Sequence, residues 1–267
     1  MAHETYRAPK AVILAAGIGS RLRPLTDHNH KCLLSVGGSA ILERMIRNCL
    51  SCGVSQFVLV LGHREDEIRT FVDKTFRGIR VTYVVNDRYH DTNTGYSLML
   101  ASRAIGVSEF LKFDADVVFD TKILRRLIDC DHPNVLCVDR NIALEAEEVK
   151  VVADDEMRVL EVGKLVDPKM ALGESIGIEK IGAKAAPLLF AELALMMEDK
   201  AHSQDYYEAA YERLLAKTAP FHALDITGLN WTEIDTAEDL AIAHALFSSP
   251  VTTISRSQQN ALDEAAV

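Results

Sequence analysis

The sequence predicts an α/β protein with a doubly wound, mostly parallel central sheet. Three observations support this prediction. Apolar runs at residues 11–14, 56–61 and 79–85 alternate with amphipathic segments at 39–53 and 64–76. The run 56–61 (QFVLVL) is apolar at nearly every position, as in a central strand covered on both faces. Small residues follow the first run directly, as expected where a strand leads into a ligand-binding turn.

The loop after the first strand has the composition of an anion-binding site. Small side chains leave its backbone open to a ligand, at Ala15, Ala16, Gly17, Gly19 and Ser20. The N–H groups of such a loop can cradle an anion, and Arg21, Arg23 and Lys31 add positive charge. The segment therefore predicts a polyphosphate site that begins at Leu14, the end of the strand.

Two common phosphate-binding motifs do not fit this loop. A Walker A motif requires a glycine followed by lysine and then serine or threonine, but Ser20 and Arg21 follow Gly19. A dinucleotide fingerprint requires a third glycine at the position of Leu22. The loop therefore belongs to a different class of phosphate-binding turn.

Composition excludes several classes of protein. With 267 residues, 48% of them hydrophobic and 25% charged, the chain can form one large core. The net charge of −10 argues against a nucleic-acid partner. Because no run of eighteen apolar residues exists and the first residues lack a signal-peptide core, we expect a cytoplasmic protein without direct membrane insertion.

The five cysteines indicate a reducing compartment, because their number is odd and their positions are scattered. Cys49 and Cys52 form a C-x-x-C pair, but Cys49 lies on the apolar face of the segment 39–53. Packing is therefore the favoured role of this pair. Ser39 is predicted to cap the helix that this segment forms.

Polar residues follow two further strands at the edge where ligands are expected. Asn86, Asn93 and Ser97 come after the strand 79–85 and could recognise a nucleotide base, although turn or capping roles are equally compatible. Asp114 and Asp116 interrupt the apolar run 110–119 near its end. Carboxylates there suit Mg²⁺, and the alternative is that they form a turn or cap the helix 120–130.

The second half of the chain changes to shorter strands between residues 134 and 180, with a hairpin at Asp154. Lys150 and Lys164 lie within two of these strands, where a solvated role is also possible. Helices follow at 183–198 and 203–215, the latter with Ser203 as a potential N-cap. Tyr207, Tyr211 and Glu208 in that helix could surround an ammonium group, or the tyrosines could simply pack.

The segment from Leu14 to Thr26, with Lys31, resembles the signature L-A-A-G-x-G-[ST]-R-L-x-P-x-T…P-K of sugar-phosphate and alcohol-phosphate nucleotidyltransferases. His30 stands where that signature has proline. The segments EEVKV, VGK and GESIGI resemble the cytidylyltransferases that act on phosphocholine, 2-aminoethylphosphonate or inositol-1-phosphate. The ending WTEIDTAEDL resembles the closing motif of the family.

This resemblance implies a Rossmann-like, GT-A-like nucleotidyltransferase fold with a small β-rich substrate-binding insertion. It implies transfer of CMP from CTP to a small phosphorylated alcohol or phosphonate, with release of pyrophosphate. The alternatives are a sugar-1-phosphate nucleotidyltransferase that uses UTP, dTTP or GTP, and a non-catalytic nucleotide-binding relative that regulates a partner.

The resemblance, together with the residue patterns above, assigns roles to residues. Arg21 and Lys31 would be catalytic, and Mg²⁺ would bind to Asp116 and Asp235, with Glu208 as the fallback ligand. The nucleotide would contact Leu14, Ala15, Ala16, Gly17, Gly19, Ser20, Arg21, Asn86, Asn93, Ser97 and Asp114. The acceptor would contact Lys150, Lys164, Glu174, Tyr207 and Glu208.

We expect residues 1–247 to form a single nucleotidyltransferase domain. Residues 10–133 would be its nucleotide-binding half and residues 134–247 its substrate-binding half. The polar, aperiodic residues 248–267 would be a flexible tail. A homodimer is compatible with this reading.

Overall fold

The computed structural model of the chain describes residues 9–141, 144–199, 202, 204–217 and 220–249. The strands are β1 (Lys10–Ala15), β2 (Ser35–Val36), β3 (Ser39–Ala40), β4 (Gln56–Leu61), β5 (Arg80–Val85), β6 (Phe110–Asp114), β7 (Val117–Phe119), β8 (Val135–Asp139), β9 (Lys150–Ala153), β10 (Val159–Gly163), β11 (Gly173–Ile181), β12 (His222–Asp225) and β13 (Trp231–Glu233). The helices are α1 (Ile41–Ser51), α2 (Glu65–Thr75), α3 (Thr94–Leu100), α4 (Ser102–Ile105), α5 (Thr121–Asp129), α6 (Ala185–Glu198), α7 (Glu208–Leu215) and α8 (Ala237–Leu246). Short 3-10 turns lie at η1 (Ser20–Leu22) and η2 (Lys31–Leu33).

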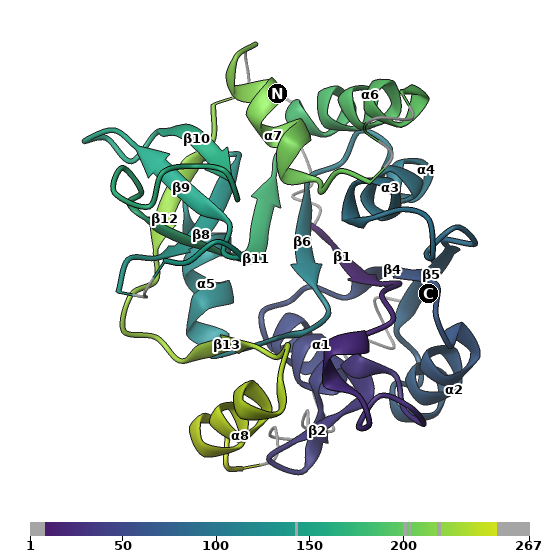
Figure 1. The fold of residues 1–267 in the computed structure, drawn as a ribbon. Helices are drawn as coiled ribbons and strands as arrows, with labels where there is room; N and C mark the ends of the chain where they lie inside the picture. The colour runs from purple at the N-terminus through teal and green to yellow at the C-terminus, as the bar shows by residue number, and fades with distance from the viewer. Residues whose placement is uncertain (1–8, 142–143, 200–201, 203, 218–219, 250–267) are drawn as a thin grey trace, which may run out of the picture.

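The main sheet is mixed, with the strand order β10-β9-β11-β6-β1-β4-β5. Strands β6, β1, β4 and β5 are parallel, which confirms the predicted doubly wound region. Strand β11 then pairs antiparallel with β6 and with β8, so the shorter strands of the second half extend the same sheet. Figure 1 shows β1, β6 and β11 side by side at the centre of the molecule.

Helices cover both faces of this sheet, because the strands alternate between two apolar cores. Ala11, Ile13 and Ala15 of β1 face the core formed with α1, α2 and α5. Val12 and Leu14 face the core formed with α3, α4, α6 and α7. In Figure 1 these two helix groups lie on opposite sides of β1. A third cluster, which includes Leu22, Val118 and Ile234, joins the loop after β1 to β7, to the residue that follows β13 and to α8.

The functional edge of the sheet is set by the order of the parallel strands. The chain passes from β1 to β4 and β5 on one side, and later returns to place β6 on the other side of β1. Such a switch point opens a crevice beyond the carboxyl ends of the two strands. The Ala115 N–H donates to the Leu14 carbonyl over 3.3 Å, so the two strand ends are joined there. The glycine-containing loop and Asp116 therefore leave the sheet next to each other.

Several local predictions are corrected by the structure. Ser39 does not cap a helix, because it pairs with Val36 in the β2–β3 hairpin and α1 begins at Ile41. The last predicted helix is shorter, since α7 begins at Glu208, and Ser203 lies outside the described residues. The hairpin at Asp154 is confirmed by the antiparallel pairing of β9 with β10.

The run 110–119 is divided rather than continuous. Strand β6 ends at Asp114 and β7 begins at Val117, with a turn between them. Asp114 therefore ends β6 and Asp116 lies in the turn, so their side chains contact different lysines, Lys112 and Lys31. The idea that they cap the next helix is wrong, because the Asp120 side chain caps α5 by accepting from the Lys122 N–H over 2.9 Å.

The remaining features concern surface and packing. Cys49 is fully buried in the apolar core, which confirms the packing role predicted for it.

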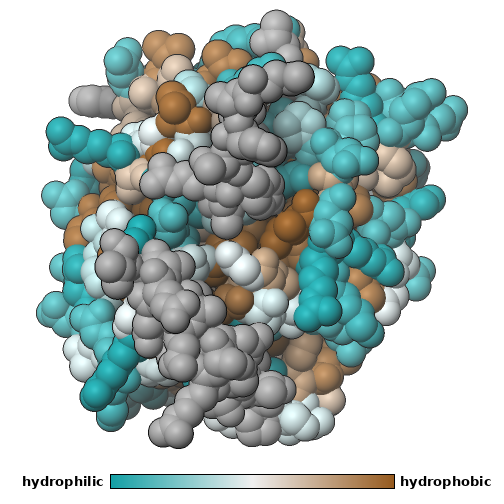
Figure 2. Space-filling model, turned by 180° about the vertical axis from the view of Figure 1, so that it is seen from behind, coloured by the Kyte–Doolittle hydropathy of each residue, from teal (hydrophilic) through white to brown (hydrophobic). Residues whose placement is uncertain are grey.

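In the described part of the chain, no helix is long and apolar enough to cross a bilayer. On the face seen in Figure 2, hydrophilic residues cover much of both flanks and apolar residues surface in separate areas. Most of the predicted flexible tail, residues 250–267, lies outside the described residues.

Candidate active site

A cavity of about 950 Å³ lies at the switch point. Most of the residues predicted for the site line it: Leu14, Ala15, Gly17, Gly19, Ser20, Arg21, Lys31, Asn93, Asp114, Asp116, Lys164, Glu174, Tyr207, Glu208 and Asp235. Four predicted residues do not line it: Ala16, Asn86, Ser97 and Lys150. The cavity therefore joins the loop after β1 to residues from the second half of the chain.

The loop after β1 is fixed by a few specific contacts. Gly19 adopts a left-handed backbone conformation with φ of 67°, which favours glycine. A Cβ at this position would come within 3.0 Å of the Lys31 side chain. The Thr26 hydroxyl donates to the Gly19 carbonyl over 2.8 Å, and Leu22 anchors the turn in the third apolar cluster. Gly19 therefore allows the loop and Lys31 to lie against each other.

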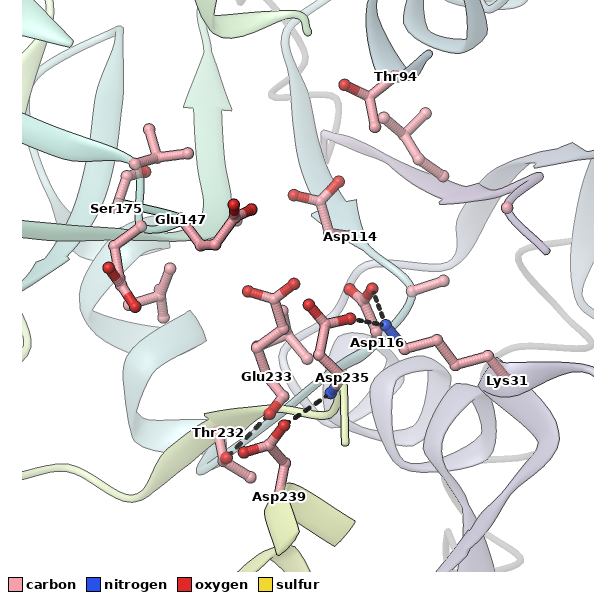
Figure 3. A pocket seen from close by; sticks show the side chains of 18 of the residues that line it. Lys31, Thr94, Asp114, Asp116, Glu147, Ser175, Thr232, Glu233, Asp235 and Asp239 are labelled. Carbon is pink, nitrogen blue, oxygen red and sulfur yellow. Dashed lines mark hydrogen bonds and ion pairs between the residues drawn. The ribbon is translucent and has the colours of Figure 1, made fainter. Parts of the chain in front are cut away.

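Lys31 lies between two aspartates from distant parts of the chain. Its Nζ is 2.7 Å from Asp116 Oδ2 and 2.6 Å from Asp235 Oδ1. Figure 3 shows this ammonium group between the two carboxylates. Burial opposes the charged form, but Asp116 and Asp235 outweigh it and raise the pKa of Lys31. Arg21 adds a second cation, with Nη1 2.9 Å from Asp235 Oδ2.

His30 explains how the Lys31 turn forms without the proline of the signature. Its Nδ1 accepts from the Cys32 N–H over 3.2 Å and thereby caps the η2 turn. Burial, followed by the neighbouring charge of His63, lowers the pKa of His30 to about 4. The ring is therefore neutral near pH 7 and has an acceptor nitrogen for this cap.

Glu233 is a site residue that our sequence reading missed. Its carboxylate lies near Asp116 and Asp235, with one oxygen from each of the three within 4.8 Å of the others. Figure 3 shows Glu233 and Asp235 side by side. The available signal was the spacing of two around the buried Ile234, because alternate residues of an extended segment share a face.

The three carboxylates fit a divalent cation. Oxygen ligands are the preferred donors for Mg²⁺. Asp116 Oδ1 is buried and has no hydrogen-bond partner, so this oxygen is left without a contact that would satisfy its charge. Asp116, Glu233 and Asp235 could therefore hold Mg²⁺, whereas Glu208 is not part of this group and lies at the start of α7, where the charge of Lys112 influences it. In this structure the Lys31 ammonium contacts two of these three carboxylates, Asp116 and Asp235.

Asp114 belongs to a different network from Asp116. The buried Lys112 Nζ lies 2.8 Å from Asp114 Oδ2 and 2.8 Å from Glu179 Oε2. The Tyr207 hydroxyl donates to Asp114 Oδ2 over 2.5 Å. Burial raises the pKa values of Asp114, Glu179 and Glu208, although Lys112 opposes each shift. One buried lysine thus pairs with two carboxylates, Asp114 in the cavity wall and the buried Glu179.

Gly177 makes room for this network, and its replacement by alanine is a specific test. A Cβ at Gly177 would lie 2.5 Å from Asp114 Oδ2, in a backbone conformation with φ of +72°. Gly53 has a similar φ of +82° but open space around it. We expect Gly177→Ala to destabilise the protein by about 1–3 kcal/mol more than Gly53→Ala, because only the former displaces the Asp114 side chain from its ion pair with Lys112. Urea unfolding of both variants measures the difference, and equal losses would contradict it.

The three polar residues after β5 separate into two groups. Asn93 lines the cavity and caps α3, accepting from the Thr94 N–H over 2.9 Å. Asn86 is buried, and its amide donates to Ser97 Oγ over 3.0 Å and to Thr92 Oγ1 over 3.2 Å. Thr94, which sequence reasoning also missed, lines the cavity beside Asn93. Asn93 therefore lies in the cavity wall. Asn86 and Ser97 instead hydrogen-bond to each other and stabilise the segment between β5 and α3.

The two lysines predicted to lie within strands have different positions. Lys150 begins β9, whereas Lys164 lies in the turn after β10, so the strand predicted for Lys164 is wrong. Lys164 lines the cavity, and its Nζ is 3.3 Å from Glu147 Oε2. Lys150 is buried, and its Nζ donates to the carbonyls of Glu145 and Glu148 over 2.9 Å each. The buried Lys150 ammonium therefore holds residues 145–148 in place through two of their carbonyls. Lys164 lies in the cavity wall, where a ligand could contact it.

The two tyrosines of the predicted ammonium site are buried packing residues. Tyr207 is 2% exposed and Tyr211 is 1% exposed, and their rings lie 5.3 Å apart between centroids. The Lys112 ammonium lies 3.6 Å from the centroid of the Tyr207 ring. The protein's own lysine therefore occupies the position that a ligand cation would need on that ring.

Comparison with known proteins places this geometry in context. The chain is 30% identical over 267 residues to CMP-5'-(3-aminopropyl)phosphonate synthase of Streptomyces rubellomurinus, an alignment that covers 95% of this chain and 40% of that protein. It is 25% identical over 251 residues to CTP:phosphoglutamine cytidylyltransferase of Campylobacter jejuni, covering 87% of this chain and 98% of that protein. The chain thus spans less than half the length of the first relative and nearly all of the second.

A solved structure agrees in fold. The CTP:phosphocholine cytidylyltransferase of Streptococcus pneumoniae superposes with a TM-score of 0.76 at 23% identity, covering 90% of this chain and 99% of that one. Residues 11–145, from β1 through the glycine-containing loop and Asp116 to the segment after β8, match the family described as the MobA-like NTP transferase domain. The chain therefore belongs to the MobA-like NTP transferase family.

Proposed function

We propose that this chain is a CTP-dependent cytidylyltransferase that transfers CMP to a small phosphorylated alcohol or phosphonate. An oxygen of the acceptor's phosphate or phosphonate attacks the α-phosphorus of CTP and forms a new P–O bond. The bond from the α-phosphorus to the bridging oxygen breaks, and pyrophosphate leaves. The acceptor oxygen is already ionised near pH 7, so no general base is needed.

The observation that carries this proposal is the arrangement of Lys31, Arg21, Asp116 and Asp235 beside the glycine-containing loop. Two strongly anionic reactants must approach each other in this reaction. Each pair of unit charges ~4 Å apart repels by about 4 kcal/mol at an effective dielectric constant of ~20. Fixed positive charge aimed at the phosphates would offset this repulsion and stabilise the charge that develops on the departing pyrophosphate.

Individual residues then take distinct roles. Asp116, Glu233 and Asp235 would hold Mg²⁺, which when bound supplies further positive charge at the phosphates. Lys31 and Arg21 would contact the triphosphate, and Asn93 would lie near the nucleoside. Lys164 is the lysine that would hold the acceptor's phosphate or phosphonate, because Lys150 does not line the cavity.

The choice of CTP and of this acceptor class is supported by the relatives. One is named a CMP-phosphonate synthase and another a CTP-dependent cytidylyltransferase. The chain's own features suit a cytoplasmic enzyme, because all five cysteines are free.

A nucleotide-by-acceptor matrix tests the proposal. Pyrophosphate release is measured with CTP, UTP, GTP or dTTP against phosphocholine, 2-aminoethylphosphonate, inositol-1-phosphate and glucose-1-phosphate. We expect turnover with CTP and at least one of the first three acceptors. Preferential turnover of UTP or dTTP with glucose-1-phosphate would instead support a sugar-phosphate nucleotidyltransferase. Binding of CTP without turnover of any pair would support a non-catalytic relative.

A further inference from the structure

The cavity wall formed by the second half of the chain is strongly acidic. Carboxylates line it at Asp139, Glu147, Glu148, Glu174 and Glu208. Among the described residues, Lys164 is the cation that lines this wall, and it is paired with Glu147. Figure 3 shows Glu147 and Ser175 across the cavity from Thr94, on the side away from the loop after β1. A ligand that carried only negative charge would be poorly matched to this wall.

Glu174 is the most constrained of these carboxylates. It lies in β11, opposite Asp139 of β8 and opposite Lys150 of β9. Its side chain lines the cavity although the residue is only 6% exposed, and its Oε2 has no hydrogen-bond partner. Burial, followed by the charges of Glu148 and Asp139, raises the pKa of Glu174 to about 7, with Lys150 opposing the shift.

The protein's own cations do not satisfy Glu174. Lys150 directs its ammonium to the carbonyls of Glu145 and Glu148, at 2.9 Å each. Lys164 directs its ammonium to Glu147. Because a buried carboxylate without a partner is unfavourable, Glu174 is suited to a cation that enters with the ligand.

An aromatic side chain completes this part of the wall. Trp231 lines the cavity, and its indole Nε1 donates to Asp139 Oδ2 over 2.7 Å. The other Asp139 oxygen accepts from the Asn141 N–H over 2.9 Å, so Asp139 is fixed and its charge remains on the wall. Carboxylates combined with an aromatic ring are the side chains that recognise ammonium groups.

We propose that the acceptor carries an amine cation, primary or quaternary, and that Glu174 binds it, with Asp139, Glu148 and Trp231 around it. This inference rests on the proposed function and specifies its substrate class. It places the amine at Glu174 rather than at Tyr207, because Lys112 already lies on the Tyr207 ring.

The proposed amine site can be tested on the unmodified enzyme by comparing acceptors that differ only in whether they carry the amine cation. Phosphocholine is compared with its neutral carbon isostere, 3,3-dimethylbutyl phosphate, and 2-aminoethylphosphonate is compared with n-propylphosphonate. We expect kcat/KM for the preferred amine to exceed that of its isostere by on the order of 10- to 100-fold, through charged hydrogen bonds if the amine is primary and through desolvated ion-pair and cation–π contacts if it is quaternary. The two pairs also show whether the site takes a quaternary or a primary amine.

A variant locates the interaction. Glu174→Gln should raise the KM for the amine acceptor on the order of 10- to 100-fold. It should leave the KM for CTP and the KM for the neutral isostere unchanged. The matched control is Glu161→Gln on β10, an exposed carboxylate that does not line the cavity. Thermal unfolding establishes that both variants are folded.

The outcomes separate this inference from the proposed function. Turnover of CTP with neutral isosteres as efficient as with amines would overturn the inference and leave the function standing. Equal effects of Glu174→Gln on amine and isostere would also overturn it. Absence of turnover with every pair would overturn the function, and calorimetric binding of phosphocholine against its isostere would then still test the amine site.

Discussion

Replacing Lys31 by alanine is expected to lower kcat for cytidylyl transfer by about 10²- to 10³-fold, the usual effect of removing one positioned group that stabilises transition-state charge. The lysine is held in place by Asp116 and Asp235, and these carboxylates keep it charged at any pH used for the assay. Pyrophosphate release at saturating CTP and acceptor measures the effect. Wild-type kcat in this variant would remove Lys31 from the mechanism.

Two further measurements make this prediction specific. Lys122→Ala is the matched control, because Lys122 is a largely exposed lysine on α5 away from the cavity. Lys31 and a divalent cation also compete for the same two carboxylates. Lys31→Ala should therefore bind Mg²⁺ more tightly than the wild type in the absence of nucleotide, which calorimetry can measure. Unchanged Mg²⁺ affinity would show that the lysine does not limit access to Asp116 and Asp235.

The fold could be predicted from the sequence where the order of apolar and polar residues within one segment determines the structure of that segment. The run at Gln56–Leu61 has the same bounds in the sequence reading and in β4, because a strand buried on both faces must be apolar throughout. Ser39 was misread, because a serine before an apolar segment resembles a helix cap. Its pairing with Val36 depends on a hairpin that the local pattern does not specify.

The residues of the candidate site could be predicted where they lie within a recognisable sequence motif. Lys31 meets Asp116 and Asp235, which lie 85 and 204 positions away. The local pattern pointed to Lys31 and Asp116, whereas Asp235 was indicated by the resemblance alone. Lys150 shows the limit of this approach. Its place in a strand was clear, but the direction of its ammonium depends on carbonyls of a neighbouring loop.

Lys112 is the clearest omission from the sequence reading. It interrupts the apolar segment FLKFD, and a charged residue at such a position indicates a buried partner. The partner, Glu179, lies directly opposite it on β11. The pairing of β6 with β11 across the sheet could not be derived from either segment alone.

Replacing Lys112 by methionine is expected to destabilise the protein by about 3–5 kcal/mol, because it leaves the buried Glu179 and the partly buried Asp114 without their shared cation. Lys112 is fully buried and contacts Asp114 and Glu179, each at 2.8 Å. Urea unfolding near neutral pH measures the loss. Lys122→Met, at a largely exposed lysine, should change stability by no more than about 0.5 kcal/mol.

The dependence of this loss on pH identifies its electrostatic origin. The pKa values of Asp114, Glu179 and Glu208 are already raised, and removal of Lys112 raises them further. The folded variant then binds more protons than the unfolded chain, so its stability falls as pH rises above the ordinary carboxyl pKa. The loss should therefore be smaller near about pH 5 than near about pH 8. The double variant Lys112→Met with Glu179→Gln should recover part of the stability at the higher pH, because it removes one unpaired charge. An equal loss at both pH values, without recovery in the double variant, would mean that Lys112 acts by packing alone.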